Sequence, residues 1–297
     1  MAERGGPAAR RWRLVRARLA EMERLVPGRG SVGVAFWDAR ARRFAAAVAD
    51  RGGTDPLVAR ARRAAGRRGS VLDVGAGPGR LALVLAPRVA QVTAVDPSPR
   101  MLAILRREAR RRELTNVRAV EGAWEDVEVA PADVGICAYV LPMIADAAGF
   151  VARLGAFTRR RAFAELNAAG ADVLVEPLWR HFHGAPRRPA PTYLDLVAIL
   201  AEQGVVAEVE VVEVPVRTRF ADLGAAVGSY RETLLLPRTA AALRELSGLL
   251  AAWLVRTGDG ALRPPLRTTP VAIVSWAGRA GVSSGGPSGR SFGPAPP

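Results

Sequence analysis

The chain has 297 residues, 49% of them hydrophobic, which is enough for one large domain or a domain with a cap. Its single cysteine excludes an internal disulfide and a cysteine-cluster metal site. No apolar run is long enough to cross a bilayer and no apolar segment follows the basic N-terminal residues, so we expect no membrane partner, no signal peptide and a cytoplasmic location. The formal net charge of +15 invites a nucleic-acid partner, but all 43 basic residues are arginines spread along the chain, a pattern typical of codon bias, so no specific nucleic acid is predicted.

Helices are predicted before the first strand. Residues 8–26 and 36–49 each carry apolar side chains at helical spacing, the second with Trp37 and Phe44 on one face. A third helix follows Pro56 and ends before Gly66. The first two predict an N-terminal helical cap over residues 1–55.

The stretch Val71 to Arg80 reads VLDVGAGPGR and predicts a buried strand, a glycine loop and the start of a helix. This unit brings a backbone close to a nucleotide-like ligand, because a Cβ would block both the tight turn and the approach. A dinucleotide-binding loop requires glycine at position 80, which is Arg80 here. The spacing is D-x-G-x-G-x-G instead, and the alternative is an ordinary strand-to-helix turn.

A second strand, residues 91–96, ends in Asp96 about 20 residues after the glycine loop. One carboxylate can accept hydrogen bonds from both vicinal hydroxyls of a ribose. Ser98 and Pro99 already provide the cap and first-turn proline of the next helix, so capping is a weaker explanation for Asp96. We therefore predict Asp96 as a ribose ligand.

The pattern continues to alternate between strands and helices. Further strands are predicted at residues 116–120, 133–138, 161–166, 205–216 and 270–276, and further helices at 99–112, 193–203 and about 220–256, the last interrupted by Pro237. Alternation of this kind is typical of an α/β protein with a parallel sheet.

The glycine loop and Asp96 together resemble the first motifs of the class I S-adenosylmethionine-dependent methyltransferases, and the resemblance covers residues 71–165 well and the rest more loosely. It implies a doubly wound, mostly parallel seven-stranded sheet with an antiparallel last strand, an N-terminal helical cap and a helical insertion between the last two strands. The expected domains are the cap at 1–55, a Rossmann-like methyltransferase domain at 56–277 with the insertion at about 221–268, and a disordered tail at 278–297. The insertion would form a lid or a homodimer surface.

The resemblance implies S-adenosyl-L-methionine as the cofactor, and no metal. Many relatives carry an acid at the position of Ala123, which contacts the adenine amino group. Here Trp124 could pack on the adenine, and Glu125 or Asp126 could replace the acid, unless these two cap a short helix. Residues 36–44 also resemble the helix that closes over the cofactor, although Trp37 and Phe44 could equally be core. The predicted cofactor-binding residues are Asp73, Gly75, Ala76, Gly77, Gly79, Asp96, Pro97, Ala123 and Trp124.

The predicted reaction is methyl transfer to a small-molecule acceptor. Cytosine C5 methylation is disfavoured because Cys137 follows Ile136 rather than proline, and the Asp/Asn-Pro-Pro-aromatic motif of base amino-methylases is absent. A cofactor of this kind carries an activated methyl group, so a base is needed only for an acceptor that is protonated at the working pH. An RNA methyltransferase and a non-catalytic cofactor-binding protein remain the alternatives.

Two catalytic candidates follow from position. Tyr139 comes directly after the fourth strand, at the edge where ligands of doubly wound sheets bind, so we expect it near the transferred methyl group. His181 and His183 are the two histidines of the chain and lie in one predicted loop after the fifth strand. His183 is predicted as a general base, and a purely structural role is the alternative. No third ligand for a metal lies nearby.

Overall fold

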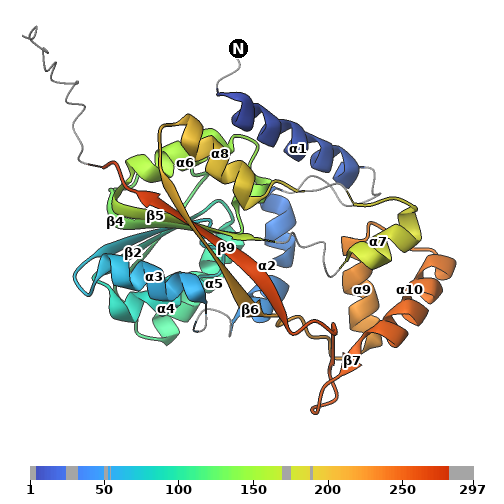
Figure 1. The fold of residues 1–297 in the computed structure, drawn as a ribbon. Coiled ribbons are helices and arrows are strands. Elements are labelled where there is room, and N and C mark those ends of the chain that lie inside the picture. Colours follow the sequence, from blue (N-terminus) through green and yellow to red (C-terminus); the bar gives the residue numbers. More distant parts are fainter. Residues whose placement is uncertain are drawn as a thin grey trace, which may run out of the picture.

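A seven-stranded sheet forms the centre of the molecule in the computed structural model, which describes residues 5–24, 33–49, 53, 55–168, 175–187 and 190–280. The strand order is β3-β2-β1-β4-β5-β9-β6 (Figure 1). β9 runs antiparallel to its neighbours β5 and β6, and the other pairs are parallel. The strands are β1 Ser70–Val74, β2 Gln91–Asp96, β3 Val117–Glu121, β4 Ala132–Ala138, β5 Thr158–Asn167, β6 Ala207–Pro215 and β9 Thr268–Ala277. The predicted α/β fold, with its antiparallel last strand, is confirmed.

Helices cover both faces of this sheet. One core lies between the sheet and α3, α4 and α5, and a second lies between the sheet and α1, α6 and α8. The bounds are α1 Pro7–Arg24, α2 Val34–Val48, α3 Pro56–Ala65, α4 Ala82–Leu85, α5 Pro99–Arg111, α6 Ala147–Ala156 and α8 Tyr193–Glu202, with short 3-10 helices at Ala86–Arg88 and Leu141–Met143. In the described part of the chain, no helix is long and apolar enough to cross a membrane.

Local signals begin the helices where the sequence predicted. The Asp55 side chain accepts a hydrogen bond from the Leu57 N–H at the start of α3, and the Ser98 side chain accepts one from the Met101 N–H at the start of α5. A proline follows each cap, where its missing N–H costs nothing. Ser98, and not Asp96, is therefore the cap of α5.

The helices before the first strand do not form one layer. α1 packs over α8 and α6, with Trp12 fully buried and its indole N–H donating to the Ile144 carbonyl at 2.8 Å. α2 packs instead over α5. The two predicted N-terminal helices are present, but they cover different sides of the sheet (Figure 1), and the cap as a domain stays a prediction.

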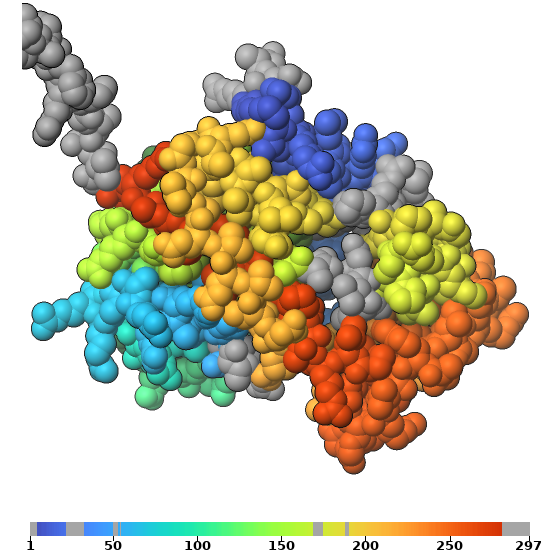
Figure 2. All heavy atoms as spheres, viewed as in Figure 1, coloured from blue at the N-terminus to red at the C-terminus, as the bar shows by residue number. Residues whose placement is uncertain are grey.

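The insertion between β6 and β9 contains two helices, α9 Leu223–Thr233 and α10 Ala240–Trp253, and a small hairpin of β7 Val255–Arg256 and β8 Leu262–Arg263. A further helix, α7 Glu176–His183, joins them in a third apolar core around Trp179, Tyr230 and Leu246. In the space-filling view this helical lobe, with α7 in yellow-green and α9 and α10 in orange, projects to one side of the rest of the molecule (Figure 2). The predicted helical insertion is confirmed, whereas the domain boundaries stay a prediction and residues 281–297 of the predicted tail lie outside the described residues.

Candidate functional site

The glycine loop leaves β1 at the carboxyl edge of the sheet and is tied to β2. Gly75, Gly77 and Gly79 have φ angles of 74°, 54° and 92°, in the left-handed region that favours glycine. The N–H groups of Gly75 and Ala76 both donate to the Val95 carbonyl, at 2.8 and 3.0 Å. The turn is therefore fixed by the backbone of the neighbouring strand before any ligand arrives.

Gly75 and Gly77 serve different purposes in this turn. A Cβ on Gly75 would lie 2.3 Å from the Val140 Cγ2 atom, so this glycine is required by packing inside the protein. A Cβ on Gly77 would meet only the Phe44 ring, at 3.9 Å. The backbone at Gly77 therefore faces open space, where a ligand can approach it.

Asp96 sits at the end of β2 and holds the loop. Its Oδ2 atom accepts from the Gly77 N–H at 2.8 Å, and its Oδ1 atom accepts from the Ser98 N–H at 2.9 Å. Burial raises the pKa of Asp96, and the two hydrogen bonds lower it by less, so the pKa stays above its ordinary value. Each oxygen keeps a lone pair, so the carboxylate can still accept hydrogen bonds from a ligand diol.

Asp73 is buried beneath the glycine loop, and one of its carboxylate oxygens accepts no hydrogen bond from the described residues. This oxygen is Oδ2, and the side chain is almost fully buried. Burial raises the pKa of Asp73 to about 7, although Arg80 lowers it. Buried acceptor atoms normally have a hydrogen-bond partner, so a ligand bound at the glycine loop could satisfy the Asp73 Oδ2 atom.

The helix α2 lies over this loop. The Asp38 Oδ1 atom accepts from the Ser98 hydroxyl at 2.5 Å and from the Arg100 N–H at 3.3 Å. Farther along α2, Arg40 and Arg43 pair with Glu232 of α9 at 3.5 and 3.3 Å. Phe44 is 36% exposed, and its ring lies 3.9 Å from the position that a Cβ on Gly77 would take, so it is not a plain core residue. α2 thus connects the glycine loop with the helical lobe, as expected of a helix that closes over a ligand.

Next to the loop lies a buried cluster formed by Asp55, Arg80, Tyr139 and Glu165, of which the sequence analysis had assigned only Tyr139 to the site. Arg80 pairs with Asp55 and, at 3.2 Å, with the Glu165 Oε2 atom. The Tyr139 hydroxyl donates to the Glu165 Oε1 atom at 3.2 Å. Burial and the nearby Asp55 raise the pKa of Glu165 to about 7, whereas Arg80 lowers it. An acid within the apolar run of the fifth strand was the sequence signal for this cluster.

Tyr139 lies where the sequence placed it, directly after β4. Its φ angle is 61°, a strained value for a tyrosine, and its N–H donates to the Glu165 carbonyl at 2.9 Å. Its side chain is 37% exposed, whereas that of Glu165 is 1% exposed. Tyr139 therefore connects the buried carboxylate to the surface, and its catalytic role stays a prediction.

The expected stacking of Trp124 on a ligand is corrected by the structure. Trp124 is 4% exposed, its indole N–H donates to the Phe150 carbonyl at 3.2 Å, and its ring lies 5.6 Å from that of Phe157. The apolar ring is more stable in the core under α6 than at the sheet edge. Glu125 and Asp126 lie exposed in a turn that begins at Ala123 and cap no helix. Only the backbone near Ala123 and these two acids remain as candidates there.

The prediction of His183 as a general base is also corrected. The two histidines lie on the helix α7 and not in a loop, and α7 packs against the helical lobe away from the sheet (Figure 1). The His183 Nε2 atom lies 2.8 Å from the Leu234 carbonyl, and its ring stacks on Trp179 at 4.0 Å. His181 pairs with Glu245 of α10 at 2.8 Å. One helical turn separates Trp179 from His183, so the buried tryptophan directs His183 toward α9.

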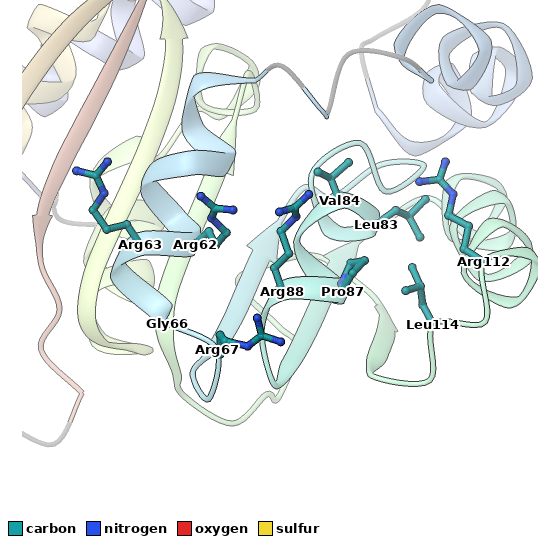
Figure 3. A pocket seen from close by; sticks show the side chains of 10 residues that line it. All are labelled: Arg62, Arg63, Gly66, Arg67, Leu83, Val84, Pro87, Arg88, Arg112 and Leu114. Carbon is teal, nitrogen blue, oxygen red and sulfur yellow. The ribbon is translucent and has the colours of Figure 1, made fainter.

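A hollow lined by five arginines lies at the opposite edge of the sheet (Figure 3). Its residues come from the end of α3 and from the segments that precede β1, β2 and β3, so it opens at the amino ends of these strands. Among the residues that the structure describes, none of the five forms an ion pair with a carboxylate, although the pKa of Glu108 is lowered by its hydrogen bond with Arg111 and also by the charge of Arg112. The arginines are Arg62, Arg63, Arg67, Arg88 and Arg112. This hollow is separate from the glycine loop, which lies at the carboxyl ends.

Comparison with known proteins places the glycine loop within a recognised domain. Residues 71–160 match the family described as a methyltransferase domain. The ubiquinone biosynthesis O-methyltransferase of Methylocella silvestris is 39% identical over 95 residues, which make up 30% of this chain and 35% of that relative. The match therefore spans about a third of the relative's length.

Two solved structures share the fold. The YcgJ protein of Bacillus subtilis has a TM-score of 0.50 and 17% identity, with 76% of this chain and 98% of that chain covered. The BH2331 protein of Bacillus halodurans has a TM-score of 0.51 and 17% identity, with 76% and 99% covered. At this identity the likeness concerns the fold alone.

Proposed function

Residues 71–160 match a methyltransferase domain, and we propose that this chain is a class I S-adenosylmethionine-dependent methyltransferase that transfers the cofactor's methyl group to a small-molecule acceptor. The observation that carries this proposal is the backbone of Gly77, which faces open space while its N–H is held by Asp96. Both lie at the carboxyl edge of a doubly wound sheet, where ligands of such folds bind.

The residues present fit the cofactor. Asp96 would hold the ribose hydroxyls, and the unpartnered Oδ2 atom of Asp73 would face the cationic end of the molecule. The segment that begins at Ala123 would border the adenine, with Glu125 or Asp126 as the acid that Ala123 lacks. When bound, the cofactor supplies an electrophilic methyl group, and the protein must position the acceptor in line and exclude water.

Three observations support a small acceptor over RNA. α2 borders the loop through Phe44 and is tied to the helical lobe by the pairs of Arg40 and Arg43 with Glu232, which restricts the approach of a large acceptor to the loop. The arginine-lined hollow, where a polyanion would bind most readily, lies at the other edge of the sheet. The Methylocella relative is a ubiquinone biosynthesis O-methyltransferase, and ubiquinone is a small molecule.

Labelled cofactor tests the proposal directly. We expect calorimetry to show binding of S-adenosylmethionine, and transfer of a labelled methyl group to at least one member of a panel of phenols, alcohols and amines. Transfer to RNA alone would favour the RNA methyltransferase, and binding without transfer to any acceptor would favour a non-catalytic cofactor-binding protein. Homodimer formation through the insertion stays a prediction, which light scattering can test.

Gly77→Ala should weaken cofactor binding by about tenfold or more while costing only about 1–2 kcal/mol of stability, because its Cβ would enter the open space and a left-handed φ is strained for alanine. Gly66→Ala is the matched control. Gly66 has a φ angle of 68° and open space around its Cβ position, but it ends α3 at the other edge of the sheet. Calorimetry and urea unfolding of both variants separate the two effects, and equal cofactor affinity in both would contradict the assignment.

A further inference from the structure

We propose that Tyr139 and Glu165 form a proton relay that accepts the proton of a hydroxyl acceptor, so the small molecule methylated by this chain is an alcohol or a phenol. This inference rests on the proposed function and deepens it by naming the acceptor class. The carboxylate is buried, and of its two hydrogen-bonded partners among the described residues Tyr139 is the more exposed, at 37% against 14% for the Arg80 side chain.

The hydrogen bonds give the relay a direction. The Tyr139 hydroxyl uses its proton to donate to the Glu165 Oε1 atom, at 3.2 Å. The lone pairs of the hydroxyl oxygen are left for a donor from outside, so a group that docks there must carry a hydrogen of its own. Arg80 occupies the other oxygen of Glu165 and holds the carboxylate in place.

The excess of negative charge in the cluster lets Glu165 accept a proton. Among the residues that the structure describes, two buried carboxylates, those of Asp55 and Glu165, share the one guanidinium of Arg80, so one negative charge is left without a cation. A buried carboxylate in excess over its cations binds a proton readily. Asp55 also accepts a hydrogen bond from the Leu57 N–H. Burial and the nearby Asp55 raise the pKa of Glu165 to about 7, so Glu165 is the group that binds the proton.

The presence of a general base indicates which class of acceptor the site methylates. A neutral amine can attack a methyl group with its lone pair and lose its proton afterwards, whereas an alcohol or phenol is a weak nucleophile until its proton is removed. In the step, the acceptor O–H proton passes to the Tyr139 oxygen as the tyrosine proton passes to Glu165. The acceptor oxygen forms its bond to the methyl carbon, the carbon–sulfur bond breaks, and its electron pair stays on sulfur.

The sign of the pH dependence follows. The relay needs ionised Glu165, so turnover should rise with pH through about 7. The charged and titratable groups that face Glu165 are Arg80, Asp55 and Tyr139. The pKa of Asp73 is also raised to about 7, but Asp73 would border the cofactor, so its titration should change the affinity for the cofactor. Measuring kcat at saturating cofactor keeps this titration out of the pH profile of kcat.

The test uses Glu165→Gln, Tyr139→Phe, their double variant and Glu165→Asp, with Tyr230→Phe as the matched control. Tyr230 is a buried tyrosine of the helical lobe with no place in the relay. On a phenol or alcohol acceptor, we expect each single substitution to lower kcat by about 100-fold, which is typical of general base catalysis, and the double variant to lose little more. Glu165→Gln should also lose the rise of kcat near pH 7, and Glu165→Asp should recover part of it.

A second readout does not depend on turnover. In protein labelled with carbon-13 at the glutamate carboxyls, the Glu165 signal, assigned by its loss in Glu165→Gln, should titrate near pH 7, and Tyr139→Phe should shift that titration. Titration of Glu165 at an ordinary glutamate value, or equal losses of kcat and cofactor affinity, would overturn the relay. Methylation of amines alone would overturn the acceptor class. If wild-type protein methylates nothing, the proposed function fails, and the carboxyl titration still reports on the Glu165 and Tyr139 pair.

Discussion

Asp96→Ala is expected to weaken the binding of S-adenosylmethionine and of its demethylated product by about 10- to 150-fold, which corresponds to roughly 1.5–3 kcal/mol for a lost charge-assisted hydrogen bond. The carboxylate would hold the ribose, and it also accepts from the Gly77 and Ser98 N–H groups. The substitution therefore removes the ligand contact and loosens the loop at the same time. Isothermal calorimetry with both ligands measures the effect.

Glu128→Ala is the control for this change. Glu128 is an exposed acid of the segment after β3 and loses the same charge, but it supports no part of the glycine loop. Its cofactor affinity should equal that of the wild type within about twofold. Unchanged affinity in Asp96→Ala would remove Asp96 from the site, and equal losses in both variants would show that only the overall charge matters.

Arg80→Met is expected to lower the free energy of unfolding by about 3–5 kcal/mol at pH 8, the usual cost of leaving a buried charge without its partner. The substitution would leave the carboxylates of Asp55 and Glu165 close together without the guanidinium that both contact. Burial lowers the pKa of Arg80, but the two carboxylates outweigh it and raise the pKa above the ordinary value, so the arginine is charged throughout this range. Urea unfolding followed by circular dichroism measures the loss.

The loss should depend on pH with a defined sign. The pKa of Glu165 is raised from 4.5 to about 7 in the folded protein, so folding favours its protonated form and stability falls as pH rises through this window. Removing Arg80 removes a cause that lowers this pKa, so the variant holds its proton more firmly. At pH 5.5 the protonated Glu165 carries no charge, and Arg80→Met should lose less stability than at pH 8.

Arg60→Met is the control that shows whether the stability loss comes from the burial of the ion pair or from the loss of any ion pair. Arg60 also pairs with a carboxylate, that of Glu210, but the Glu210 side chain is 56% exposed. Exposed pairs of this kind contribute under about 1 kcal/mol, so this variant should lose little stability at either pH. A similar loss in Arg60→Met and Arg80→Met would contradict the buried cluster as a source of stability.

The sequence by itself determined the features that depend on neighbours along the chain. The left-handed turn of Gly75 to Gly79, the caps at Asp55 and Ser98, and Asp96 at the end of β2 all follow from residue types at fixed spacing. Alternation of apolar strands and amphipathic helices likewise predicted the α/β sheet, whereas its antiparallel last strand was expected only from the family resemblance. These signals are local, because φ preferences, caps and periodicity act within a few residues.

The tertiary structure alone decided the features that depend on which surfaces meet. Asp55, Arg80, Tyr139 and Glu165 are distant in the chain and come together because β4 and β5 are neighbours and α3 begins at the same edge. Packing likewise decided that Trp124 fills the core and that His183 faces α9. A side chain's partner across the fold is set by strand register and by which face of a helix is buried, and a single sequence records neither for residues this far apart.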